Sequence, residues 1–191
     1  PNGSVPLGRF VGAIAEVKQK LGLTVVVHTG VVDFDMALRL KEAGVDAALI
    51  DVIGSDETIR EIYQLNVCVS DYEKSLSALH QSGIPLVPHV LVGLHYGKLQ
   101  GEFHALQMIS KNSPSAVIII ALMPIRGTSM QDVAPPSPED IARVLVAARF
   151  MMPKTPLVLG CMRPKGKHRA KTDMFAVKAG VNAMAFPTER A

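Results

Sequence analysis

A repeated alternation of strand and helix is the feature that most constrains this sequence. Six segments are short, apolar and rich in β-branched residues, as buried parallel strands are. They are residues 24–28, 45–52, 86–94, 116–122, 157–160 and 182–186. Helical patterns lie between them, and one of these ends at Ser82-Gly83, a typical helix stop. A strand–helix unit recurs about every 30 residues, which predicts a parallel sheet with right-handed crossovers.

The length of the chain limits how far this repetition can go. A closed (βα)₈ barrel has eight units and usually needs about 250 residues, whereas this chain has 191. We therefore predict an α/β fold in a single domain, residues 1–191. The sheet is either a partial TIM-type barrel of six parallel strands with outer helices or an open doubly wound sheet. The 48% hydrophobic content is sufficient for a sizeable core.

Composition excludes several functional classes. The sequence contains no run of 18 apolar residues, so we expect no membrane span. Two cysteines, Cys68 and Cys161, are too few for a disulfide framework and fit a cytoplasmic location. Aromatic residues make up 5% and Trp is absent, which argues against a base-stacking surface and a nucleic-acid partner. The opening residues, Pro1 to Ser4, have the composition of a loop and favour a fragment of a longer protein.

The strand at residues 86–94 carries a polar side chain where none is expected. Strand parity places Val87, His89, Leu91 and Gly93 on one face. The strand is apolar enough to be buried on both sides, so His89 needs a partner, a ligand or a wet cavity. A glycine-bearing loop and a helix follow, and such βα loops are where ligands bind in α/β proteins.

Three segments resemble the biotin synthase branch of the radical S-adenosylmethionine superfamily, in order and in register. They are TGVVDFDMALRLKEAGVDAALIDVIG at residues 29–54, SGIPLVPHVLVGL at 82–94, and residues 143–186 with VLVAARFMMPKTPLVLGCMR and AGVNAMAF. The run AARFMMP, followed at the expected distance by Arg163 and AGVN, is the most specific part. The resemblance covers nearly the whole chain.

The resemblance implies which part of a barrel is present. The six strands correspond to the third to eighth strands of the family, so the first two βα units are missing. Those units carry the Cys-x₃-Cys-x₂-Cys motif that binds the [4Fe–4S] cluster, and this sequence has no such motif. The cofactors expected are S-adenosylmethionine and a [4Fe–4S] cluster whose ligands are not in this chain. The chain is then a fragment, one half that needs a partner subunit, or a relic.

The resemblance also implies a cofactor site. Asp51, at the end of a strand, corresponds to the carboxylate that accepts the ribose hydroxyls of S-adenosylmethionine. Val92, Gly93 and Leu94 correspond to the turn that contacts adenine, and Met123 to the backbone edge beside it. The structural alternatives are an Asp that caps the following loop and a simple glycine bend within barrel packing.

Substrate binding is assigned to His28, His89 and Arg163. Biotin synthase has cysteines at Val26 and Val87 for a second, sulfur-donating cluster, so that cluster is not expected here. His28 and His89 lie two residues further on and keep the inward faces, so their rings should lie close together in the lumen. Either they contact substrate or a metal, or they are hydrogen-bonded core residues. No catalytic residue and no metal ligand is assigned.

The implied activity is reductive cleavage of S-adenosylmethionine and hydrogen abstraction from an unactivated carbon, with sulfur insertion as one outcome. Ile120 replaces a substrate-binding Asn, which argues against biotin synthase itself and keeps a lipoyl synthase-like enzyme open. The expected partners are a small-molecule or acyl-type substrate, the missing barrel segment or a partner subunit, and a second copy through the open edge. The basic residues 163–171 are interpreted as a solvated loop or a carboxylate-binding site. The competing hypothesis is a non-catalytic barrel subunit that binds a nucleoside or a protein.

Overall fold

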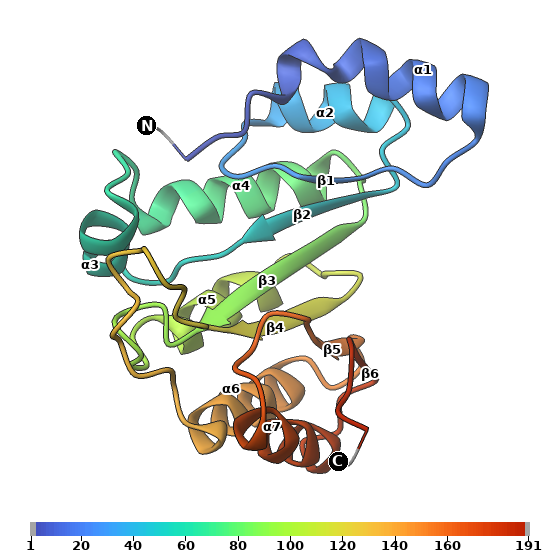
Figure 1. Ribbon diagram of the computed structural model, residues 1–191. Helices are drawn as coiled ribbons and strands as arrows, with labels where there is room; N and C mark the ends of the chain where they lie inside the picture. The colour runs from blue at the N-terminus through green and yellow to red at the C-terminus, as the bar shows by residue number, and fades with distance from the viewer. Residues whose placement is uncertain (1–2, 190–191) are drawn as a thin grey trace.

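The strands of the sheet follow one another in chain order. The computed structural model describes residues 3–189, and these form one parallel six-stranded sheet with the order β1-β2-β3-β4-β5-β6. The strands are β1 (Val26–His28), β2 (Ala47–Asp51), β3 (Leu86–Val92), β4 (Val117–Ala121), β5 (Leu157–Leu159) and β6 (Ala183–Met184). This arrangement confirms the predicted α/β fold of six parallel strands (Figure 1).

Helical segments precede β1 and occupy the connections between the strands. They are η1 (Leu7–Arg9), α1 (Val11–Leu21), α2 (Phe34–Glu42), α3 (Asp56–Thr58), the π-helical η2 (Ile59–Tyr63), α4 (Val69–Gln81), α5 (Glu102–Ser110), α6 (Pro138–Met151) and α7 (Lys167–Lys178). Figure 1 shows them in succession along the sheet, from α1 and α2 beside β1 to α6 and α7 beside β5 and β6. Within residues 3–189, no helix has both the length and the apolar composition needed to cross a membrane.

The sheet has a helix-covered outer face and an open inner face. On β3, Leu86, Val90 and Val92 are at most 2% exposed and belong to the core, whereas the alternating Val87 and Leu91 are only half-buried. Such alternation is expected when helices cover one face of a parallel sheet. Within the described residues, β1 pairs in the sheet only with β2 and β6 only with β5, so the barrel stays open.

Helix starts agree with the sequence where a capping side chain exists. Asp33 accepts a hydrogen bond from the Met36 N–H at 2.8 Å, and Ser137 accepts one from the Asp140 N–H at 3.0 Å. By contrast, α7 begins at Lys167, within the basic residues 163–171 that were interpreted as a solvated loop. Its N-cap is Gly166, which has no capping side chain from which the helix start could be predicted. Most of the basic run therefore lies in the first turns of α7, and its interpretation as a loop is wrong.

Candidate functional site

The carboxyl ends of β1, β2 and β3 bring three polar side chains to the inner face. His28 ends β1 and Asp51 ends β2. In the sheet register, Asp51 is the Cα partner of His89, and His28 is the partner of Leu49. Because partners in a parallel sheet point to the same face, His28, Asp51 and His89 share the inner face. Strand parity and register alone fix this arrangement.

The two histidines lie side by side, as predicted. Their ring centroids are 5.2 Å apart and the ring planes are tilted by 44°. His89 is 9% exposed, whereas His28 is exposed to the lumen. The prediction that the two rings lie close together on the inner face is therefore confirmed.

The environment of His89 favours its neutral form. Burial lowers the pKa of His89, and the nearby His28 lowers it further, while the negative charge of Asp51 acts in the opposite direction. Its Nδ1 atom is buried and has no hydrogen-bond partner among residues 3–189. A buried polar atom without a partner is rare in folded proteins and is suited to a ligand.

A cavity of about 370 Å³ opens beside this group. Its polar lining includes His28, Asp51, Tyr63 and Tyr72. Burial, with a smaller effect of the Asp51 charge, raises the pKa of Tyr63 to about 12. Burial also raises the pKa of Tyr72, followed by the effects of Tyr63 and Asp51. Both phenols therefore stay protonated at neutral pH and can donate hydrogen bonds into the cavity.

The residues proposed for S-adenosylmethionine are brought together only in part. Asp51 and Leu94 line one small cavity of about 10 Å³, together with Glu102. Val92 is fully buried toward the helices, and its carbonyl accepts a hydrogen bond from the Leu122 N–H at 2.9 Å. Met123 directly follows Leu122, and it does not line the small cavity that Asp51 and Leu94 share.

The turn at Gly93 depends on the absence of a side chain. Gly93 has φ +75°, and an added Cβ would lie 2.7 Å from Cγ of Pro136. Its N–H donates to Oε1 of Glu102 at 2.8 Å. Glu102 is 4% exposed, and burial raises its pKa against the opposing effect of the Gly93 hydrogen bond. Sequence reasoning did not identify Glu102, although it is an acidic residue in a helix start close to a glycine loop.

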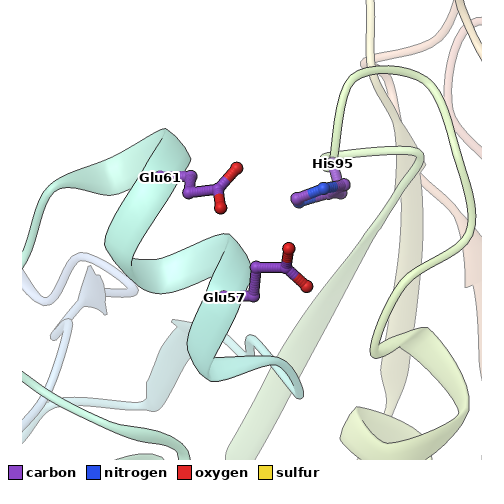
Figure 2. Close-up of side chains that lie close together, drawn as sticks. All are labelled: Glu57, Glu61 and His95. Carbon is purple, nitrogen blue, oxygen red and sulfur yellow. The ribbon is translucent and has the colours of Figure 1, made fainter.

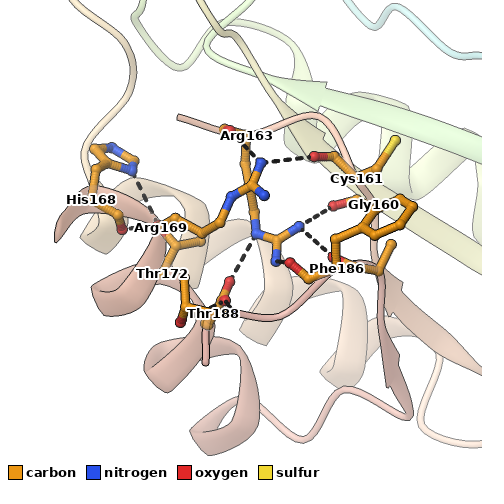
Figure 3. Close-up of polar contacts among 10 residues, drawn as sticks. Gly160, Cys161, Arg163, His168, Arg169, Thr172, Phe186 and Thr188 are labelled. Atoms are coloured by element: carbon orange, nitrogen blue, oxygen red, sulfur yellow. Dashed lines mark hydrogen bonds and ion pairs between the residues drawn. The ribbon is translucent and has the colours of Figure 1, made fainter. Parts of the chain in front are cut away.

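Arg163 has a structural role, which corrects its predicted assignment to substrate binding. The side chain is fully buried, and Nε donates to Oδ1 of Asp173 at 2.8 Å. Nη1 donates to the carbonyls of Gly160 and Ala185 at 2.6 and 2.9 Å, and Nη2 donates to Phe186 O at 3.3 Å. Figure 3 shows the guanidinium enclosed by these groups, which join the end of β5 to α7 and the chain after β6. These donors are directed at the protein itself.

The neighbouring basic residues also contact the protein. Nη2 of Arg169 donates to the carbonyls of Cys161 and Arg163 at 3.2 and 3.0 Å. His168 Nε2 lies 2.8 Å from Pro136 O, and Lys171 forms an ion pair with Glu139. These contacts stabilise the start of α7. They leave less of this cationic charge for a carboxylate ligand than the sequence suggested.

The described residues do not fit an iron–sulfur cluster. A [4Fe–4S] cluster of this superfamily needs three cysteine ligands, and the sequence has two cysteines. Cys68 is the N-cap of α4 and Cys161 follows β5, and both are exposed. Asp51 and its cavity, in contrast, have the exposed carboxylate and the space that a nucleoside needs.

Comparison with known proteins gives the same relationship as the sequence motifs. Residues 119–188 match the Biotin and Thiamin Synthesis associated domain. The biotin synthase of Aromatoleum aromaticum is 28% identical over 172 residues, which are 90% of this chain and 52% of that protein. The chain thus spans about half the length of the curated relatives it matches.

Solved structures agree in fold. The crystal structure of methylornithine synthase (PylB) has a TM-score of 0.72 and 20% identity, over 94% of this chain and 52% of that one. The structure of HydG, a maturase of the [FeFe]-hydrogenase, has a TM-score of 0.71 and 16% identity, over 94% and 42%. The chain therefore has the fold of part of a (βα)₈ barrel.

Proposed function

From the homology to the biotin synthase-like branch of the radical S-adenosylmethionine enzymes, we propose that this chain forms the cofactor-binding and substrate-facing part of such an enzyme. The observation that carries the proposal is the match to biotin synthase over 90% of the chain, with Asp51 at the carboxyl end of a barrel strand beside a cavity. The reaction is reductive cleavage of S-adenosylmethionine, followed by hydrogen abstraction from an unactivated carbon.

The cysteines that would hold the cluster, which would supply the electron for this cleavage, are not in this chain, because its sequence has only Cys68 and Cys161. They belong either to a preceding segment of the same protein or to a partner subunit. In both cases the added strands lie along the open edges of the sheet at β1 and β6, whose backbone groups are available for pairing.

Asp51 binds the ribose of S-adenosylmethionine. A carboxylate has two acceptor oxygens, which suit two adjacent hydroxyl groups. The Gly93 turn allows the backbone to approach adenine, and its φ of +75° is a conformation that side chains disfavour. The backbone edge at Met123 lies beside this turn, because Leu122 is bonded to Val92. Tyr63 and Tyr72 line the cavity of about 370 Å³ together with Asp51.

His28 and His89 contact the substrate on the floor of the lumen. The rest of the inner face near them is aliphatic, with Leu91, Ile118 and Ile120 in register with or next to His89. This combination suits a substrate with an apolar body, such as a small acyl-type molecule, and one polar group at the histidine pair. The unpartnered Nδ1 of His89 supplies one hydrogen bond to that polar group.

A second candidate function is supported by the cysteine count. With two cysteines, the chain can instead be a barrel subunit that binds a nucleoside without catalysis. The coding sequence upstream of Pro1 distinguishes the two functions. A Cys-x₃-Cys-x₂-Cys motif there supports the enzyme, whereas a start codon close to Pro1 supports the non-catalytic subunit.

The activity itself is tested on the full-length protein loaded with its cluster. After reduction with dithionite, mass spectrometry should detect 5′-deoxyadenosine and methionine formed from S-adenosylmethionine. The Asp51→Ala variant should form much less of both at a limiting concentration of S-adenosylmethionine. A loaded and folded protein that forms neither product would contradict the proposed function.

The substrate role of the histidines is tested by separating the two half-reactions. His89→Ala should stop conversion of the substrate while cleavage of S-adenosylmethionine continues without it. His80→Ala, at the exposed end of α4, is the matched control and should keep both. Loss of cleavage and conversion together in a folded His89→Ala protein would exclude a specific substrate contact.

A further inference from the structure

A cluster of two carboxylates and one imidazole lies outside the cavity described above. Glu57 and Glu61 lie one turn apart on the segment formed by α3 and η2, and His95 lies in the loop after β3. Their ligand atoms all lie within 4.8 Å of one another, and this is the one group of three His, Cys, Asp or Glu residues found within residues 3–189 that does so. Figure 2 shows both carboxylates pointing from one helix toward the imidazole.

Two side chains outside the cluster hold its members in place. Thr58 is 1% exposed, and its Oγ1 lies 3.2 Å from Nδ1 of His95. Gln100 donates from Nε2 to Oε2 of Glu57 at 2.5 Å. Because Nδ1 of His95 faces the threonine hydroxyl, Nε2 remains for a ligand. Metal-binding histidines are oriented in this way, with one nitrogen on the metal and the other on a fixed polar partner.

The charge around the cluster favours a cation. Two carboxylates one helical turn apart repel each other. Arg60 offers Glu61 only an exposed contact at 3.8 Å, which is weak in water.

We propose that Glu57, Glu61 and His95 bind one divalent transition-metal ion such as Mn²⁺, Co²⁺ or Zn²⁺. Carboxylate with imidazole suits these ions better than Mg²⁺ or Ca²⁺, which prefer oxygen ligands alone. Three protein ligands leave coordination positions for water or for a group of a bound molecule. The ion joins the α3–η2 segment to the loop that follows Gly93, so it fixes the rim of the cavity. The site is independent of the proposed radical chemistry.

Mn²⁺ is the probe that tests this site. The full-length protein loaded with its cluster is titrated with Mn²⁺, and the free ion is counted by its electron paramagnetic resonance signal. One Mn²⁺ should bind per chain, and added Zn²⁺ should displace it. Glu57→Gln, Glu61→Gln and His95→Ala should each weaken binding at least tenfold. Thr58→Val should weaken it about tenfold, as loss of an orienting partner does, whereas Thr58→Ser should restore it.

Matched controls are available elsewhere on the protein surface. Glu42→Gln and His80→Ala change exposed residues of the same types outside the cluster and should bind Mn²⁺ like the wild type. Circular dichroism checks the fold of every variant, and the three ligand variants are independent, so failure of one to fold leaves two. Absence of Mn²⁺ and Zn²⁺ binding to the wild type would overturn the proposal. Equal binding by the wild type and the folded ligand variants would overturn it as well.

Discussion

Two groups of polar side chains lie at the carboxyl end of the same sheet, and their hydrogen bonding differs. At β5, Arg163 and Asp173 are fully buried, and every contact of the guanidinium ends on another group of the protein. At β1 to β3, His28 and Asp51 are exposed to the lumen, and His89 has a buried nitrogen without a partner among residues 3–189.

The difference separates polar groups that hold the fold from those available to a ligand. Asp173 also accepts hydrogen bonds from the N–H and hydroxyl of Thr188 at 2.9 and 3.3 Å, so Arg163 and Asp173 fasten the last described segment of the chain to α7. A buried charge is tolerated when it is paired in this way. An unpartnered atom such as Nδ1 of His89 contributes nothing of this kind to stability. This environment supports the proposed contact of His89 with a ligand.

The largest effect is expected when the structural group is broken. Arg163→Ala leaves the Asp173 carboxylate buried without its main partner, and we expect the free energy of unfolding to fall by about 3–5 kcal/mol. Urea denaturation followed by circular dichroism measures this change. Arg143→Ala is the matched control, because Arg143 pairs with Asp140 at 2.9 Å but its side chain is 70% exposed. The control should lose at most about 1 kcal/mol.

Equal losses of unfolding free energy in the two arginine variants would remove the contrast between the two groups. Such a result would mean that the Arg163 network is open to water in solution. The assignment of Arg163 to substrate binding would then be reopened.

A smaller effect is expected in the polar group at β1 to β3, and it concerns the binding of S-adenosylmethionine rather than stability. Asp51→Ala removes a charged hydrogen-bond acceptor for the ribose, so S-adenosylmethionine should bind more weakly by about 1.5–3 kcal/mol. Titration calorimetry on the full-length, cluster-loaded protein measures this. Asp132→Ala, in an exposed loop, is the control and should bind normally. Unchanged binding by Asp51→Ala would exclude Asp51 from the site.

The sequence predicted the features that depend on local periodicity. Alternation along residues 24–28 and 86–94 placed His28 and His89 on one face, because successive side chains of any strand point to opposite faces. The count of strand–helix units likewise predicted an open sheet of six strands. Both inferences need only the chain order and the right-handed crossover.

Features that depend on distant partners were missed. Arg163 donates hydrogen bonds to Asp173, Ala185 and Phe186, which are 10 to 23 residues away in the sequence. No local sequence pattern distinguishes such a buried arginine from one that binds substrate. The short helix after β2 is different, because a signal existed. Ser55 precedes two acidic residues and caps the Thr58 N–H at 3.2 Å, which is a typical helix start that was not identified from the sequence.

The smallest effect concerns the pH dependence of stability. Burial lowers the pKa of His89 in the folded protein, so the unfolded chain binds the proton more readily. Stability should therefore be fully present above the unfolded value near 6.5 and decrease as the pH falls below it. His89→Gln removes this contribution. Urea denaturation between pH 5 and 8 should show a smaller loss toward acid in the variant than in the wild type.

Comparing His89→Gln with the wild type also cancels the contributions of other titrating groups to the pH dependence of stability. The raised pKa of Glu102 acts with the opposite sign, because the folded protein holds that proton more tightly and loses stability as the pH rises through the raised pKa. This contribution is common to both proteins and cancels in their difference. His80→Gln, on the exposed end of α4, should follow the wild type. If His89→Gln also follows the wild type, His89 is hydrated in solution, and the contrast with the dry Arg163 group is weaker than the structure indicates.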